Sequence, residues 1–245
     1  LIAAAHRLAA HLASVRTGEG EPPPEDVRTA LRDVVGRCLY GVDINPMAGE
    51  LCKVSLWIEA LEPGRPLSFL ENKILCGNSL LGTTPKLLEE GIPDDAFAVL
   101  RGGDKNLTST LKKQNKEERG GQGTLFADYG EGWGGGAPIQ QQYQRIESID
   151  DSTLAGLHRK ERIYQKFLES AEYRHEKLVA DAWCAAFLWP KGGGAPTAIT
   201  QHILYLLKSE PDLVPADTLE TIIELARVNQ FFHWHLSFPG VFQTD

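Results

Sequence analysis

The chain has no apolar run of about 18 residues, the length that a membrane-spanning helix needs, so we expect no transmembrane segment and no membrane partner. Its four cysteines form no C-x-x-C pair, and no histidine pair accompanies them at zinc-finger spacing. We therefore expect no metal site, and reduced thiols in a cytoplasmic protein. The first residues do not form a signal peptide, because His6 and Arg7 interrupt a short apolar stretch.

An excess of positive charge is also missing. The sequence has 25 basic and 33 acidic residues, which gives a net charge of −8. This balance excludes a domain that coats nucleic acid with a wholly basic surface, and it leaves room for a local basic face. The hydrophobic content of 42% is that of a globular protein, so we expect a packed core.

One stretch combines a buried-strand pattern with the start of a helix. Leu39 to Val42 is a short apolar run that ends at Asp43, and Asn45 and Pro46 suit the cap and the first turn of a helix. Apolar residues then recur at spacings of three and four, which is typical of a helix. These residues are Met47, Leu51, Val54, Ile58 and Leu61.

The acid in this stretch is the first candidate binding residue. Ligands of open α/β sheets bind at the carboxyl ends of the strands. A carboxylate at Asp43 can therefore accept hydrogen bonds from both hydroxyls of a nucleoside ribose, while Ile44 lies against the flat adenine. The alternative interpretation is a capping or solvated loop residue.

A second short strand is predicted at Ile74 to Cys76, followed by Gly77, Asn78 and Ser79. If this strand neighbours the first, Asn78 lies at the same edge of the sheet as Asp43. An asparagine amide both donates and accepts, which matches the N1 and N6 edge of adenine. The alternative is a simple turn, since Gly-Asn is a common turn pair.

The rest of the chain is mostly helical in pattern. Residues 1–15 and 24–35 precede the first strand as helices, and three further helical segments follow at 146–189, 197–208 and 215–229. Residues 101–144 are polar and of low complexity, which predicts a flexible linker or surface loop. The basic triplet His158-Arg159-Lys160 could contact DNA phosphates, or form the solvated face of a helix.

The C-terminal part is dense in aromatic residues from Phe231 to Phe242. His233 and His235 alternate there, so they would share one face of a strand. A metal site needs a third ligand, and no residue nearby offers one at a recognisable spacing. We therefore expect these histidines to pack rather than to bind a metal.

Three stretches together resemble one protein family. Leu39 to Ala48, Asn72 to Gly82 and Phe232 to Phe242, in this order, are similar to the adenine-specific DNA methyltransferases of restriction-modification and phage-defence systems, most of all to the large Eco57I-like class. The resemblance implies an α/β fold, with a partial Rossmann-like class I methyltransferase sheet and a large, mainly helical insertion. It also implies methyl transfer from S-adenosylmethionine to N6 of adenine in double-stranded DNA, with restriction or defence-system subunits as further partners.

The resemblance assigns roles to five residues of this sequence. Asp43 would bind the ribose hydroxyls of S-adenosylmethionine, Ile44 would pack on its adenine, and Asn45 would shape the rim. Asn78 and Ser79 would meet the adenine edge, although many members of the family have aspartate where Asn78 stands.

Two motifs of the family are missing from this sequence. In the family, the glycine-rich loop that holds the methionine end of the cofactor lies upstream of the position of Leu1, and the catalytic N-P-P-[YFW] motif follows the position of Phe242. We therefore expect an internal fragment of a longer protein that is catalytically inert by itself, with no catalytic residue of its own.

The expected organisation has four segments. Residues 1–100 would form a partial S-adenosylmethionine-binding core, 101–145 a flexible linker, 146–230 a helical insertion, and 231–245 a return to the core. Two other functions stay open. One is a nicotinamide-dependent oxidoreductase fragment, although no G-x-G-x-x-G precedes Asp43. The other is a helical module that binds DNA or a partner protein.

Overall fold

The computed structural model covers residues 1–245 and describes all of them except 99–104, 126–135, 193 and 243–245. Two compact units divide the chain. The first comprises residues 1–77 and 142–168, and the second comprises residues 78–141 and 169–245. This division differs from the four segments expected from the sequence, because residues 142–168 pack with the N-terminal part of the chain.

The expected Rossmann-like fold class is wrong. The structure is 66% helical, and its described residues contain one sheet of only two parallel strands. These are β1 (Gly41–Asp43) and β2 (Ile74–Cys76), each of three residues. Most other apolar residues recur at helical rather than alternating spacing, so they form helices and leave too few strands for such a sheet.

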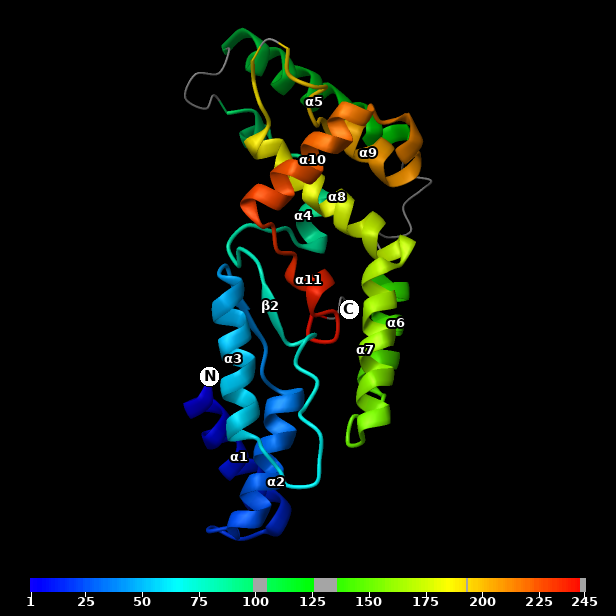
Figure 1. Ribbon diagram of the computed structural model, residues 1–245. Helices are drawn as coiled ribbons and strands as arrows, with labels where there is room; N and C mark the ends of the chain where they lie inside the picture. The colour runs from blue at the N-terminus through cyan, green and yellow to red at the C-terminus, as the bar shows by residue number, and fades with distance from the viewer. Residues whose placement is uncertain (99–104, 126–135, 193, 243–245) are drawn as a thin grey trace. The chain divides into compact units, whose positions relative to one another are not determined.

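The structure has a strand at each predicted position, and the two strands pair. The second strand is confirmed at Ile74–Cys76, whereas the first covers Gly41–Asp43 instead of Leu39–Val42 and is not buried. Gly41 pairs with Ile74, Val42 with Leu75 and Asp43 with Cys76, in parallel register. The first unit also contains α1 (Ile2–Thr17), α2 (Pro24–Arg37) and α3 (Pro46–Glu59), which pack together with the strands, as Figure 1 shows in blue and cyan. The end of α6 (Gly136–Glu147) and most of α7 (Leu154–Glu169) complete this unit.

Small residues form the contact between α1 and α2. Ala5, Ala9 and Ala13 of α1 are fully buried, and they pack in one cluster with Ala30 and Val34 of α2. Leu8 of the same helix is exposed. Because alanine has so short a side chain, the helix backbones can approach closely along this face.

The apolar stripe that marks α3 in the sequence lies on its exposed side. Its five members, from Met47 to Leu61, are 44–69% exposed. The buried face of α3 is instead formed by Gly49, Lys53 and Leu56. The periodicity therefore predicted the helix correctly and did not predict which face is buried.

The second unit is helical. Its longer helices are α5 (Lys105–Leu125), α8 (Ala171–Leu188), α9 (Gln201–Ser209) and α10 (Ala216–Asn229). Its shorter elements are α4 (Pro85–Glu90), η1 (Asp94–Phe97), η3 (Pro211–Leu213) and α11 (Trp234–Ser237). The central part of α8 is buried from Val179 to Ala186. Within the described residues, no helix is long and apolar enough to cross a membrane.

The expected linker at residues 101–145 contains α5 and α6, while its residues 101–104 and 126–135 lie outside the described part. Asn115 explains why so polar a segment packs as a helix. Its fully buried amide donates to the carbonyl of Ile92 and accepts from the backbone N–H of Gln201. Arg119 adds an ion pair with Asp94 at 2.8 Å.

Candidate functional site

The end of β1 carries the first candidate residue. Asp43 is the last residue of the strand and is exposed, and its backbone C=O accepts from the N–H of Gly77 at 2.9 Å. The parallel register therefore places Gly77, the residue that follows β2, beside Asp43 at the carboxyl ends of both strands.

One oxygen of the Asp43 carboxylate is fixed by a hydrogen bond. Its Oδ1 accepts from the N–H of Asn45 at 2.8 Å, and no described residue hydrogen-bonds to its Oδ2. Asn45 in turn accepts from the N–H of Met47 at 3.0 Å, which confirms it as the cap of α3. Ile44 is 55% exposed, so its side chain offers apolar surface next to the acid. The carboxylate is thus oriented and keeps one oxygen available for a ligand.

Asn78 and Ser79 belong to the second unit, where they begin a turn. Asn78 Oδ1 accepts from the N–H of Leu80 at 3.1 Å, and its backbone C=O accepts from the N–H of Leu81 at 3.1 Å. The turn that was the alternative interpretation of Gly-Asn is therefore present. Among the described residues, no partner is found for the amide nitrogen Nδ2 of Asn78, which stays available as a donor.

The C-terminal aromatic segment packs directly on this turn. Asn78 donates its backbone N–H to Gln230 at 2.7 Å and forms a parallel bridge with Phe231. Phe232 donates to the carbonyl of Leu81 at 2.8 Å, and the indole of Trp234 donates to that of Ser79 at 3.1 Å. Two of the three stretches that carry the family resemblance are therefore in contact in the second unit.

Glycine is required at the centre of this contact. A Cβ atom at Gly82 would lie 2.0 Å from the carbonyl oxygen of Phe232, far inside van der Waals contact. The two backbones can therefore pair closely only because residue 82 has no side chain.

A pocket of about 400 Å³ opens beside this contact, within the range of small-molecule sites. Its lining comes from two segments: Ser79, Leu80, Gly82, Thr83, Thr84, Pro85, Trp234, His235 and Phe242. Trp234 and Phe242 were not predicted from the sequence as binding residues. The sequence feature that could have indicated them is the high density of aromatic residues in this segment, which also contains two histidines.

The two histidines of this segment have different environments. His233 is buried, and its Nδ1 accepts from the N–H of Thr83 at 3.2 Å, so Nε2 carries the hydrogen and donates to Asp181 at 3.0 Å. His235 has a buried Nδ1 without a hydrogen-bond partner in the described structure. Burial, together with the nearby His233, lowers the pKa of His235 to about 4, against a smaller opposing contribution from the Thr83 backbone.

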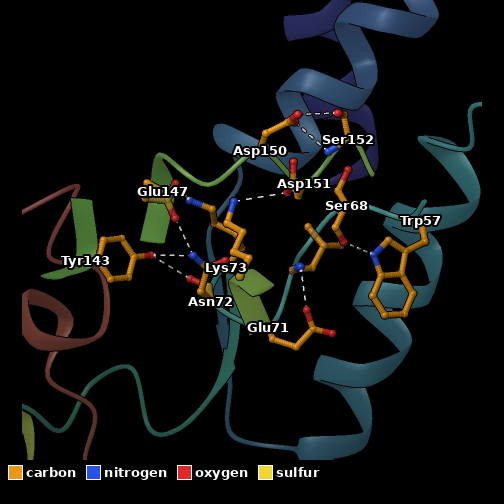
Figure 2. A network of polar contacts seen from close by, with 12 residues as sticks. Trp57, Ser68, Glu71, Asn72, Lys73, Tyr143, Glu147, Asp150, Asp151 and Ser152 are labelled. Carbon is orange, nitrogen blue, oxygen red and sulfur yellow. Dashed lines mark hydrogen bonds and ion pairs between the residues drawn. The ribbon is translucent and has the colours of Figure 1, made fainter. Parts of the chain in front are cut away.

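A buried polar cluster stabilises the segment before β2 (Figure 2). Lys73 is fully buried and donates to Glu147 and to the Tyr40 hydroxyl, each at 2.8 Å. Asn72 donates to the other Glu147 oxygen at 2.6 Å and to the Tyr143 hydroxyl at 3.2 Å. Both residues belong to a stretch that resembles the methyltransferase family, and their contacts here are structural.

Lys160 of the basic triplet and Cys184, one of the four cysteines, are both buried. Lys160, part of the basic triplet, is buried and pairs with Asp151 at 3.3 Å, so it is not exposed to a DNA phosphate. Burial, followed by the nearby Asp181, raises the pKa of the Cys184 thiol to about 12, which leaves it protonated and unreactive at neutral pH. In the part of the chain that the structure describes, no cluster of three or more metal-ligating side chains is found.

Searches with this chain found no matching family model, no matching curated protein and no matching solved structure. The geometry of the site and the resemblance of three sequence stretches are therefore the basis on which a function is inferred.

Proposed function

We propose that this chain binds S-adenosylmethionine through Asp43 and forms part of an adenine-specific DNA methyltransferase. The single observation that supports this most is the exposed carboxylate at the carboxyl end of β1, with one oxygen fixed by Asn45 and the other unpartnered among the described residues. A carboxylate held in this way is suited to accept hydrogen bonds from two neighbouring hydroxyls, as a ribose presents them.

The two residues that follow Asp43 add to this inference. The exposed side chain of Ile44 offers an apolar surface for a flat base, and Asn45 fixes the start of α3 next to the acid. In the second unit, the amide nitrogen of Asn78 has no partner among the described residues, and such a donor is of the kind that the ring nitrogen N1 of adenine accepts. The methyltransferase family to which three stretches are similar uses residues of these types for the same ligand.

The methyl-transfer step itself is not assigned to any residue of this chain. A methyltransferase acting on adenine must turn the base out of the duplex and accept hydrogen bonds from its amino group during attack on the sulfonium methyl. The family supplies these acceptors from an N-P-P-[YFW] motif, which this sequence does not contain. The proposed contribution of this chain is therefore cofactor binding, with double-stranded DNA as the proposed partner of the enzyme.

Isothermal titration tests this proposal, with S-adenosylmethionine and NADH as separate ligands. We expect S-adenosylmethionine to bind and NADH to bind at least about tenfold more weakly. Asp43→Asn should weaken S-adenosylmethionine binding by about 1.5–3 kcal/mol, because hydrogen bonds to a charged group are lost. The control Asp212→Asn changes another exposed acid, in η3, and should have no effect. Equal affinity of the wild type and Asp43→Asn would overturn the proposal, as would preferential binding of NADH.

A further inference from the structure

Helix α3 has an apolar stripe that stays exposed in the described structure. Its five members, from Met47 to Leu61, are 44–69% exposed, and the first four of them lie within the helix. We propose that this stripe is a self-association surface, on which α3 of a second copy of the chain packs in antiparallel orientation. The proposal goes beyond cofactor binding at Asp43 and does not depend on it.

The spacing of the stripe indicates that its partner is a helix. Its members follow one another at intervals of four, three, four and three residues, which is the spacing of the core positions of a two-stranded coiled coil. Side chains at this spacing form a narrow seam between which the side chains of a second helix fit. The opposite face of α3, at Gly49 and Leu56, is buried, and Leu56 belongs to the core cluster of its own unit. The seam therefore points away from that core.

The seam is complementary to itself in antiparallel orientation. When Leu51 lies opposite Val54 of a second copy, two-fold symmetry also places Val54 opposite Leu51 of that copy. The same register pairs Met47 with Ile58, twice. All four members within the helix thus meet an apolar side chain, and the contact removes apolar surface of both copies from water at once, which is favourable.

The charges beside the seam are compatible with this pairing. Ala48, Glu50, Ser55 and Trp57 flank the four members within the helix, and only Glu50 among these is charged. Antiparallel packing brings Glu50 near Trp57 of the second copy, so these flanking positions oppose no two like charges. Parallel packing would instead place both Asp43 carboxylates at the same end and align the two helix dipoles, and both effects are unfavourable. Antiparallel packing is therefore the orientation that the charges favour.

Sedimentation equilibrium of the whole chain, over a range of protein concentrations, tests the proposal. We expect the wild type to form a reversible dimer. Leu51→Lys should raise the Kd of this dimer by about a hundredfold, because two-fold symmetry places the buried charge in the interface twice. The matched control Ile223→Lys changes an exposed apolar residue of α10, and it should leave the Kd unchanged.

A mixture of two variants tests the antiparallel register. Val54→Glu alone should also weaken the dimer, since it too buries an unpaired charge. In a mixture of Leu51→Lys and Val54→Glu, antiparallel packing places the introduced lysine opposite the introduced glutamate and keeps the second contact between Leu51 and Val54. We therefore expect a mixed dimer at concentrations at which each variant alone is monomeric. Parallel packing would not place these two charges opposite each other.

Thermal unfolding shows whether each variant is folded, which we expect because all three positions are exposed. A wild type that is monomeric at every concentration overturns the proposal and means that the stripe serves a different partner. A folded Leu51→Lys with an unchanged Kd overturns it too, because the dimer would then use another surface. A mixture of Leu51→Lys and Val54→Glu that stays monomeric overturns the antiparallel register.

Discussion

The indole nitrogen of Trp234 donates a hydrogen bond of 3.1 Å to the backbone carbonyl of Ser79, although 155 positions separate the two residues. This bond fixes an aromatic ring of the C-terminal segment onto the turn that follows β2. A second backbone bond, from Phe232 to Leu81, runs beside it at 2.8 Å. The two segments thus line one pocket of the second unit.

Gly82→Ala tests whether this contact is as close as the structure has it. The added Cβ would meet the carbonyl oxygen of Phe232 at 2.0 Å, and neither backbone can move without losing hydrogen bonds. We expect the free energy of unfolding to fall by about 2–3 kcal/mol, the range of overpacking in a filled site, as measured by urea denaturation.

Gly120→Ala is the matched control for this substitution. Gly120 lies in α5 of the same unit, and a Cβ atom there would meet nothing within 4 Å. Alanine at an exposed helical position should raise the free energy of unfolding by about 0.5–1 kcal/mol. Equal effects of the two substitutions would show that residues 82 and 232 are not in close contact.

Glu147→Gln tests the buried cluster around Lys73. The substitution leaves a fully buried ammonium group without its carboxylate, and an uncompensated buried charge is strongly unfavourable. Because Glu147 is itself 30% exposed, we expect a loss of about 2–4 kcal/mol in the free energy of unfolding, below the largest values for fully buried pairs.

Glu224→Gln provides the comparison for a surface ion pair. Glu224 and Arg227 are more than half exposed, and solvent screening leaves pairs of this kind with little effect on the free energy of unfolding. If Glu147→Gln lowers the free energy of unfolding no more than Glu224→Gln does in the same denaturation experiment, Glu147 does not stabilise the buried ammonium group of Lys73.

The stability of the protein should depend on pH through His235. Its pKa is about 4 in the folded protein and near 6.5 in the unfolded chain, so between these values the unfolded state binds the additional proton. This contribution to stability is therefore complete above pH 6.5 and is lost as the pH falls towards 4. The expected loss is about 3 kcal/mol, since one pKa unit corresponds to about 1.4 kcal/mol.

His235→Gln removes this titration and isolates its effect. The difference in free energy of unfolding between wild type and variant should shrink as the pH is lowered from 7 to 4, in denaturation curves at several pH values. His202→Gln, at an exposed histidine, should not change the pH profile in this way. A constant difference between the wild type and His235→Gln would contradict a buried, neutral His235.

The local structure around Asp43 could be predicted from the sequence because its determinants are local. A short apolar run, an acid and an Asn-Pro pair are enough to specify a strand end and a capped helix, and the structure has both. The partner strand at Ile74 was recognisable for the same reason. The number of strands in the sheet could not be predicted, because it depends on which segments far apart in the sequence pair.

Burial and long-range contacts were beyond sequence reasoning. The apolar stripe of α3 is exposed while Gly49 and Lys53 are buried, since neighbouring elements decide which face is covered. Helix α5 was predicted as a linker because one of its buried residues, Asn115, bonds to residues 23 and 86 positions away. The pocket residue Trp234 was missed because its role depends on the distant Ser79.

The most direct test of the central claim is a crystal structure of the protein with S-adenosylhomocysteine, the demethylated form of the cofactor. The account predicts that both ribose hydroxyls lie about 2.5–3.0 Å from the carboxylate oxygens of Asp43, the distance of hydrogen bonds to an ionised acceptor. A ribose bound away from Asp43, with no hydrogen bond to its carboxylate, would contradict it.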